Sequence, residues 1–329
     1  MRTAVIGHRP RRGVTQGQGE GVPDQRPNAR GYSDAAIDIV EQEAGIRLDV
    51  VSGDECPDSA ATRLPMVTVG IDLAGYSGTT GVCRVTWAER PVVELLNARS
   101  DEDLLAVMRS ADKTGLNSPV GWPVTFMSLL AAHQAGRKLP IRSRYMPHPG
   151  GSEGLGTFTH RLTDDLAWKR TGAGKQRPLS VAADKLGVVA MRAVDLLERL
   201  AEAGPSVPRD GSGSVAEVYP AFALIQWGLA SKVSYKGSKP GALAARAEIL
   251  AGLADGLSLE LSECVRDRCR RSDHDLDALI SAVVARAAAC GMTHLPATEE
   301  ECATAAVEGW IHLPHRELPL SAVRGGAAP

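Results

Sequence analysis

Four residues of the chain have the types and spacing expected of a divalent-metal site. Asp72 lies near the end of the apolar, β-branched run 66–76, and Glu217 is a lone acid in a short apolar strand pattern. His274 and Asp277 share one face of a predicted helix start, because residues three or four apart are neighbours on a helix. Carboxylates with one imidazole suit Mg²⁺ or Mn²⁺. Two such ions can activate water and stabilise the leaving oxygen in phosphodiester hydrolysis, so the pattern predicts that chemistry.

Each of these residues also has a structural interpretation. Asp72 could be an exposed acid at a strand end or the cap of a turn, and the sequence leaves both interpretations open. Acids at a helix start are favoured by the helix dipole, but capping alone does not call for His274 and Asp277. Asp277 directly precedes the apolar Ala278-Leu279, and a buried carboxylate needs a ligand or a partner, which favours a site. Glu217, taken alone, is better explained as an outward-facing residue of an edge strand.

Further residues could complete the site. Asn117, at the end of a predicted fourth strand, could ligate through its carbonyl oxygen, although Asn is also common in turns before Ser-Pro. Asp273 can join Asp277 on its helix face. A group of charged residues is equally well explained as an anion-binding arm for substrate or as solvated surface. Its members are Arg161 and Asp164 with the nearby Lys169, Arg170, Lys175 and Arg177. Lys236 is a further candidate for substrate binding.

The elements that would position these residues indicate an α/β domain. Three strands are predicted to form an antiparallel meander, followed by a helix that Ser100 caps, a fourth strand and a helix opened by Pro123. A fifth strand and several helices follow, ending in a short strand or packed tail. The predicted strands are 66–76, 82–87, 91–96, 114–119 and 215–219; the helices after Pro123 are 180–203, 220–229, 242–253, 258–269 and 273–290; the tail is 308–314.

This order predicts a mixed sheet of about five strands, flanked by helices, with the first strand at its centre. Such a domain presents its strand ends as a site. Residues 9–30 are rich in Gly, Gln, Pro and Arg. We expect a disordered or over-called extension over 1–65, with a short helix or strand at 35–51. The folded domain is expected over 66–329, with a helical insertion around 139–210 that begins with a long loop.

Composition excludes several classes of protein. The 329 residues carry a net charge of −2 and 4% aromatics, so neither a global basic field nor extensive base stacking is indicated. None of the six cysteines forms a CxxC pair, which argues against a zinc ribbon. No transmembrane run or secretory signal is evident, and a cytoplasmic location is the default expectation. The P-loop and dinucleotide motifs are absent, as is a Ser-His-Asp order.

Short segments spread between Met66 and about Pro314 resemble, in their order, those of the domain-of-unknown-function family 429. Members of that family are described as predicted nucleases of the RNase H fold. The segments are Gly70-Ile71-Asp72-Leu73-Ala74, Asn117-Ser118-Pro119-Val120-Gly121, Arg161-Leu162-Thr163-Asp164, Pro178-Leu179-Ser180, Glu217-Val218-Tyr219-Pro220, Asp277-Ala278-Leu279 and Glu308-Gly309-Trp310-Ile311.

The helix start His274-x-x-Asp277 also looks like that of RuvC-type resolvases in the RNase H-like superfamily. This resemblance implies an RNase H-like fold, a nucleic acid substrate and two Mg²⁺ ions held by Asp72, Glu217, His274 and Asp277. One departure is Asn117, where the family usually shows Asp in an Ile-Asp-Ala-Pro-like motif. If that Asp is a ligand, the site here is weakened or inactive.

Two rival functions come from other classes. RNase H-like folds are related to actin-like ATPases and sugar kinases, in which a first-strand Asp followed by a Gly/Thr turn handles nucleotide phosphate. Asp72 with Gly78-Thr79-Thr80-Gly81 fits that description, although a second phosphate loop and a second domain are not evident. The other rival is a catalytically inactive, metal-free binding scaffold.

Overall fold

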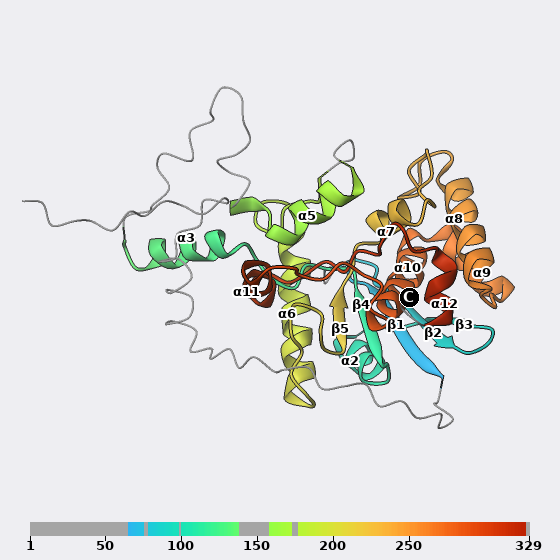
Figure 1. The fold of residues 1–329 in the computed structure, drawn as a ribbon, viewed down its shortest axis with the longest axis horizontal. Coiled ribbons are helices and arrows are strands. Elements are labelled where there is room, and N and C mark those ends of the chain that lie inside the picture. Colours follow the sequence, from blue (N-terminus) through green and yellow to red (C-terminus); the bar gives the residue numbers. More distant parts are fainter. Residues whose placement is uncertain (1–64, 76–77, 99, 138–157, 173–176, 327–329) are drawn as a thin grey trace, which may run out of the picture.

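A five-stranded mixed sheet forms the centre of the protein (Figure 1). The structure, a computed structural model, describes residues 65–75, 78–98, 100–137, 158–172 and 177–326. The strand order is β3-β2-β1-β4-β5. β1 and β2 pair antiparallel, as do β2 and β3, whereas β4 and β5 continue the sheet parallel to β1. The strands are β1 (Met66–Asp72), β2 (Gly81–Trp87), β3 (Val92–Leu96), β4 (Lys113–Leu116) and β5 (Val215–Glu217).

This sheet confirms the predicted α/β architecture. The first three strands form the expected antiparallel meander, and β1 is the central strand of the five. The predictions for residues 1–64 and for the loop at 139–157 fall outside the described residues. Because β1, β4 and β5 run in the same direction, their carboxyl ends meet at one edge of the sheet, where Asp72, Asn117 and Glu217 stand.

One face of the sheet is covered by α10 (Asp273–Ala289), the helix that the sequence predicts over 273–290. Two glycines allow this close packing: a Cβ atom on Gly70 would lie 1.9 Å from the carbonyl oxygen of Ala278, and one on Gly115 would lie 2.2 Å from that of Ser281. Outside α10 lie three helices, α8 (Ala242–Leu257), α9 (Glu263–Arg271) and α12 (Leu320–Gly325). The start of α10 is thereby fixed against the end of β1.

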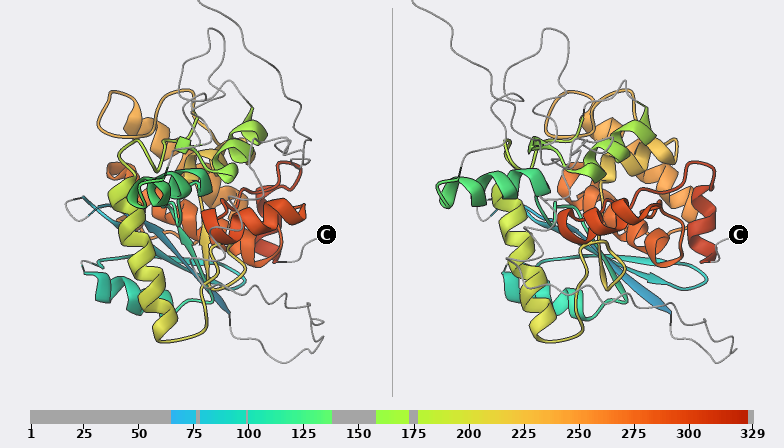
Figure 2. Two further views of the ribbon diagram at one scale, coloured as in Figure 1. Left: turned by 90° about the vertical axis from the view of Figure 1, so that its left-hand side faces the viewer. Right: turned by 60° about the vertical axis from the view of Figure 1, so that its left-hand side comes forward.

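The other face of the sheet is covered by α2 (Asp101–Arg109) and α6 (Gly187–Glu202) (Figure 2). Ser100 caps α2 in a capping box with Asp103, as its sequence predicts. α6 begins seven residues later than the predicted start at Ser180. There the Ser180 hydroxyl accepts hydrogen bonds from the backbone N–H groups of Ala182 and Ala183, which holds a turn instead of a helix.

The remaining helices lie around the edge that holds the carboxyl strand ends. They are α3 (Val124–Gln134), α5 (Leu162–Thr171), α7 (Pro220–Gln226) and α11 (Glu299–Glu308). The predicted strand or tail at 308–314 contains the last residue of α11, and Ile311 then forms an isolated parallel bridge with Glu217. In the described ranges, every helix is too short or too polar to cross a membrane.

Replacement of Gly70 by Ala is expected to lower the free energy of unfolding by about 2 kcal/mol, because the added methyl group meets the backbone of α10. Gly187→Ala is the control, since its Cβ would meet its nearest atom, the Val181 carbonyl oxygen, at 3.6 Å. That variant should be neutral or slightly stabilising, because Ala is the better helix former. Urea unfolding of both variants measures the difference. Equal stabilities would show that α10 does not pack on β1 this closely.

Candidate functional site

The carboxylate of Asp72, at the carboxyl end of β1, joins the fourth strand to the start of α10. Its Oδ1 accepts a hydrogen bond from Asn117 Nδ2 at 2.6 Å, and its Oδ2 lies 2.7 Å from His274 Nδ1. Asn117 immediately follows β4, and its backbone N–H donates to the carbonyl oxygen of Ile71. This geometry places the Asp72 carboxylate beside the start of α10.

His274 is electrostatically coupled to Asp72. The hydrogen bond to the Asp72 carboxylate raises the pKa of His274, partial burial opposes this shift, and the charges of Asp72 and Asp273 add to it. The imidazole therefore holds a proton more readily than an isolated histidine. Since 43% of the His274 side chain is exposed, that proton can exchange with solvent.

The carboxylate of Asp277 is completely buried one turn further along α10. Its Oδ1 accepts a hydrogen bond from the Tyr235 hydroxyl at 2.9 Å, and its Oδ2 accepts one from the ammonium group of Lys236. The pKa of Lys236 is lowered overall, because burial outweighs the opposing effect of the charges of Asp72 and Asp273. Lys236, predicted to contact substrate, therefore contacts the predicted ligand Asp277 and lies in the field of two further carboxylates.

The loop that carries Tyr235 and Lys236 is tethered to three helices. Arg246 of α8 is 1% exposed, and its Nη1 donates to the carbonyl oxygens of Tyr235 and Gly237 at 2.6 and 3.0 Å. Its Nε donates to the carbonyl oxygen of Arg270 at the end of α9. The Gly237 N–H donates to Asp273 Oδ2 at 3.3 Å, so the loop is also held to the first residue of α10. The position of the Lys236 backbone is thus fixed independently of its ammonium group.

Glu217 does not join Asp72 in one ligand cluster, contrary to the prediction. Its register partner on β4 is Leu116, which pairs with Ile71 on β1. Because successive side chains of a strand alternate between faces, Glu217 shares the face of Ile71, and Asp72 points to the other. The carboxylate is instead bound in a bidentate pair by Arg161, at 2.7 and 2.6 Å, and also accepts the Val120 N–H.

Arg161 is the centre of a buried ionic network. It is 1% exposed and also binds Asp164 and the carbonyl oxygen of Glu308. Burial acts to lower the pKa of Arg161, but the charges of Asp164 and Glu217 raise it overall. The Glu308 carboxylate accepts the N–H groups of Val124 and Leu162, and burial raises its pKa to about 7. This network joins β5 to α5, α11 and the start of α3.

The predicted anion-binding arm is therefore not one surface. Arg161 and Asp164 are interior residues, at 1% and 3% exposure. Lys169 is exposed on α5, and the guanidinium carbon of Arg170 lies 5.8 Å from the centre of the Trp310 ring. Lys236 belongs to the Asp277 pair. Arg177 pairs with Asp165, and Lys175 falls outside the described residues. The start of α5 turns Arg161 inward, whereas Lys169 on its last turn is exposed, so the residues of the arm lie in separate environments.

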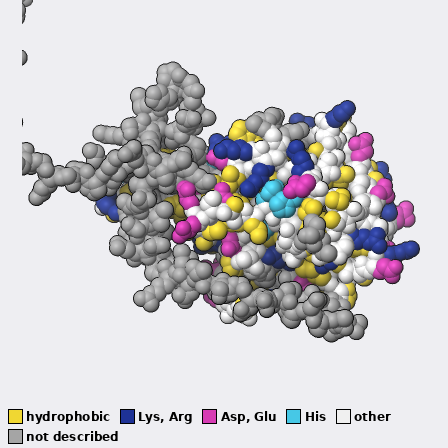
Figure 3. All heavy atoms as spheres, in the orientation of Figure 1, with side chains coloured by type: hydrophobic (Ala, Val, Ile, Leu, Met, Phe, Trp, Pro, Cys, Tyr) yellow, Lys and Arg dark blue, Asp and Glu magenta, His cyan; other side chains and the backbone are white. Residues whose placement is uncertain are grey.

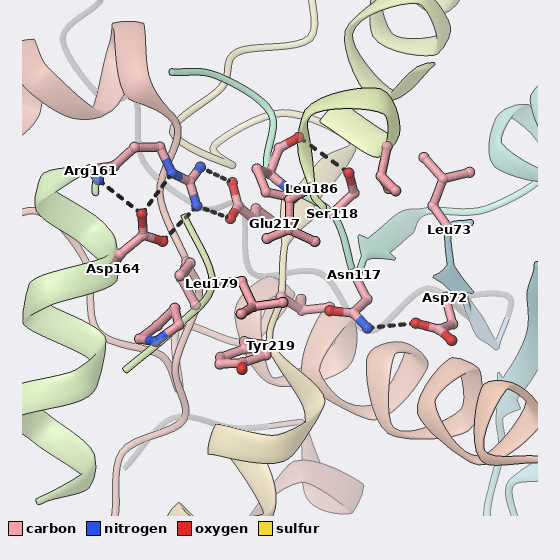
Figure 4. Close-up of a pocket in the computed structure, with 15 residues that line it drawn as sticks. Asp72, Leu73, Asn117, Ser118, Arg161, Asp164, Leu179, Leu186, Glu217 and Tyr219 are labelled. Carbon is pink, nitrogen blue, oxygen red and sulfur yellow. Dashed lines mark hydrogen bonds and ion pairs between the residues drawn. The ribbon is translucent and has the colours of Figure 1, made fainter. Parts of the chain in front are cut away.

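A cavity of about 190 Å³ separates the two groups of charged residues (Figure 4). Asp72 and Asn117 border one side, and Glu217 with Arg161 and Asp164 borders the other. Apolar side chains, among them Leu179, line the space between them. The cavity lies at the carboxyl ends of the strands, the position where α/β sheets commonly bind ligands.

The donor types around Asp72 suit a hard divalent cation, but their hydrogen bonds are already occupied. Across the ranges that the structure describes, no group of three or more His, Cys, Asp or Glu side chains is arranged to hold a metal ion. Asn117 and His274 take the oxygens of Asp72, while Tyr235 and Lys236 take those of Asp277. Ligation would require an exchange of these partners, and the exposed stem of Lys236 makes it the easiest one to displace.

Three residues of the site and its support had no predicted role: Tyr235, Arg246 and Glu308. The sequence around Tyr235 gives no sign that its hydroxyl contacts Asp277 on α10. The sequence around Arg246 likewise gives no sign that it holds the loop of Tyr235. Glu308 was singled out only within the segment Glu308-Gly309-Trp310-Ile311. Its apolar surroundings in that segment are the one signal of burial that the sequence offered.

Comparison with known proteins assigns the chain to one family. The sequence profile of the family described as "Protein of unknown function (DUF429)" matches residues 70–301, a range that includes Asp72, Asn117, Glu217, His274 and Asp277. No curated protein and no solved structure matches the chain. The function must therefore be argued from the geometry of the site.

Proposed function

The chain belongs to the DUF429 family of unknown function, and from its site we propose that it is a divalent-metal-dependent nuclease with an RNase H-like fold. The observation that carries the proposal is the contact of Asp72, at the end of the central strand, with His274 at the start of the helix packed on that strand, one helical turn before Asp277. Asp72 and His274 are 202 residues apart in the sequence, and the fold brings their side chains within hydrogen-bond distance.

The sheet supports the fold part of the proposal. An antiparallel meander of three strands, followed by two strands parallel to the first, agrees with the RNase H-like sheet that the sequence resemblance implies. Fold alone does not establish an activity, so the chemistry rests on the side chains. The ammonium of Lys236 pairs with the Asp277 carboxylate, and the charges of Asp72 and Asp273 act on it as well.

The ligands proposed for Mg²⁺ or Mn²⁺ are Asp72, Asp277 and His274, with Asp273 and the Asn117 carbonyl oxygen completing the set. A bound divalent cation supplies a more acidic water and positive charge next to the leaving oxygen of a phosphodiester. Asn117 orients the Asp72 carboxylate through Nδ2. His274 Nδ1 lies against the Asp72 carboxylate, and a protonated imidazole must lose one of its two protons before a ring nitrogen can ligate.

Glu217 is not included in this ligand set, although it borders the same cavity. Both of its oxygens are held by Arg161, and the removal of one partner of a buried ion pair is costly. Its proposed role is to fix the wall of the cavity across from Asp72. The surface in Figure 3 carries basic and acidic side chains interspersed, so it offers nucleic acid local contacts instead of a continuous basic track.

The test is cleavage of a mixed panel of single- and double-stranded DNA and RNA, with Mg²⁺ or Mn²⁺ and with EDTA. We expect metal-dependent cleavage by the wild type and a loss of at least about a hundredfold in Asp72→Asn, because the substitution removes a ligand charge from the site. The variant keeps the shape of the side chain, and circular dichroism checks that it is folded. No cleavage of any substrate by the folded wild type would contradict the proposal.

A second candidate function is nucleotide binding, and a different cavity favours it. A polar cavity of about 340 Å³ is lined by the turn residues Gly78, Thr79 and Thr80 together with Arg192 and Arg268. Both arginines are already paired, Arg192 with Asp101 and Arg268 with Asp275, which reduces the charge available to a phosphate. If the wild type binds ATP and Arg268→Gln weakens that binding, the result would support this candidate. Absence of ATP binding by the wild type would contradict it.

A further inference from the structure

The position of the Lys236 ammonium has a consequence for metal binding. Asp277 is fully buried, and a buried carboxylate is costly unless it is paired. Tyr235 supplies one neutral hydrogen bond and Lys236 supplies the only ion pair that the described residues give this carboxylate. The charges of Asp72 and Asp273 also act on the same ammonium. Lys236 therefore places its positive charge where the charges of three carboxylates attract a cation.

The lysine can leave this position without unfolding its loop. Its side chain is 45% exposed, whereas that of Asp277 is 0% exposed. The backbone around it is held by Arg246 and Asp273 through carbonyl and N–H groups, none of which involves the ammonium. Lysine is a point charge on a flexible four-carbon stem, so rotation of that stem moves the charge into solvent.

We propose that the Lys236 ammonium is a built-in competitor for the divalent cation: it pairs with Asp277 in the metal-free protein and is displaced when Mg²⁺ or Mn²⁺ binds. This inference rests on the proposed function and adds to it a residue that sets metal affinity. When a ligand must first displace an internal group, its apparent affinity is its intrinsic affinity multiplied by the fraction of protein in the open state. Lys236 thereby keeps the carboxylates paired at low metal concentration and delays loading until the metal is abundant.

The test is calorimetric titration of the full chain with Mn²⁺, without nucleic acid. Lys236→Met removes the competing charge, and we expect Mn²⁺ to bind about tenfold more tightly than to the wild type. Lys239→Met is the matched control, because it removes the same charge from an exposed residue of the same loop. Its affinity should stay within about twofold of the wild type, since exposed charges are screened.

A second variant and a second readout make the result independent of folding defects. Lys236→Gln keeps a hydrogen-bond donor for Asp277 but carries no charge, and it should also bind Mn²⁺ more tightly. In the wild type, Mn²⁺ should increase the labelling of the Lys236 amine by an amine-reactive ester, measured by mass spectrometry, because displacement exposes the amine.

The outcomes separate the two proposals. If the wild type binds Mn²⁺ and both Lys236 variants bind it equally or more weakly, Lys236 is not a competitor for the metal. That result would not contradict the nuclease proposal. Labelling of Lys236 that falls or stays constant on Mn²⁺ addition would also overturn it. Absence of Mn²⁺ binding in the wild type and in both variants would contradict the metal-dependent nuclease itself.

Discussion

Arg161→Met is expected to lower the free energy of unfolding by about 3–5 kcal/mol, because it leaves buried carboxylates without their cation. The Arg161 side chain is 1% exposed, and the side chains of its partners Asp164 and Glu217 are 4% and 3% exposed. Methionine fills a similar volume but supplies none of the five hydrogen bonds that the guanidinium donates to Asp164, Glu217 and Glu308. Urea denaturation measures the loss.

Arg177→Met is the matched control for this variant. Arg177 also pairs with an acid of α5, Asp165, but the two side chains are 29% and 36% exposed. Solvent screens such pairs, and we expect a cost of less than about 1 kcal/mol. Similar stabilities for the two variants would show that the Arg161 network is not a buried support. Arg161→Lys should recover only part of the loss, since lysine cannot make the bidentate contact with Glu217.

Asp277→Asn is expected to abolish the response to metal and reduce cleavage by at least about a hundredfold, because it removes a buried ligand charge. Its amide oxygen can still accept the Tyr235 hydroxyl, and Lys236 can turn to solvent. The loss of metal-free stability should therefore be moderate, about 1–2 kcal/mol. In the wild type, added Mn²⁺ should raise the melting temperature by mass action, whereas in this variant it should not.

Asp275→Asn is the control for Asp277→Asn, since it makes the same charge change two residues earlier on α10. Asp275 pairs with Arg268 on the side of the helix start away from Lys236. This variant should keep both the Mn²⁺-induced stabilisation and the cleavage. If Asp275→Asn and Asp277→Asn lost them equally, the effect would come from the charge of the helix start, and the specific role of Asp277 would be wrong.

Local signals in the sequence were sufficient for the central part of the fold. The run from Met66 to Asp72 forms a mostly buried strand, and the start of α10 lies against its end. Both elements could be predicted because an apolar strand pattern and a helix start are each recognised from neighbouring residues. The capping of α2 by Ser100 was equally local. Helix α11 was not predicted, although Thr298 caps it and Glu301 follows three residues later, which is the pattern of a helix start.

The partners of the charged residues could not be predicted, because they depend on contacts distant in the sequence. Glu217 is bound by Arg161, 56 residues away, and the register of β5 turns it from the face of Asp72. Asp277 is bound by Tyr235 and Lys236, which lie in a loop without hydrophobic periodicity. Residue types therefore identify acids that need partners. Packing decides which acid pairs with an internal cation and which is left for a ligand.

The most direct test of the central claim is anomalous diffraction from crystals of the full chain grown with Mn²⁺. The account predicts a manganese peak between the carboxylates of Asp72 and Asp277, with the Lys236 side chain turned away from Asp277 and Glu217 still paired with Arg161. The contradicting result would come from protein that cleaves nucleic acid with Mn²⁺. Its crystals would show no manganese at these carboxylates and would keep the Lys236–Asp277 pair.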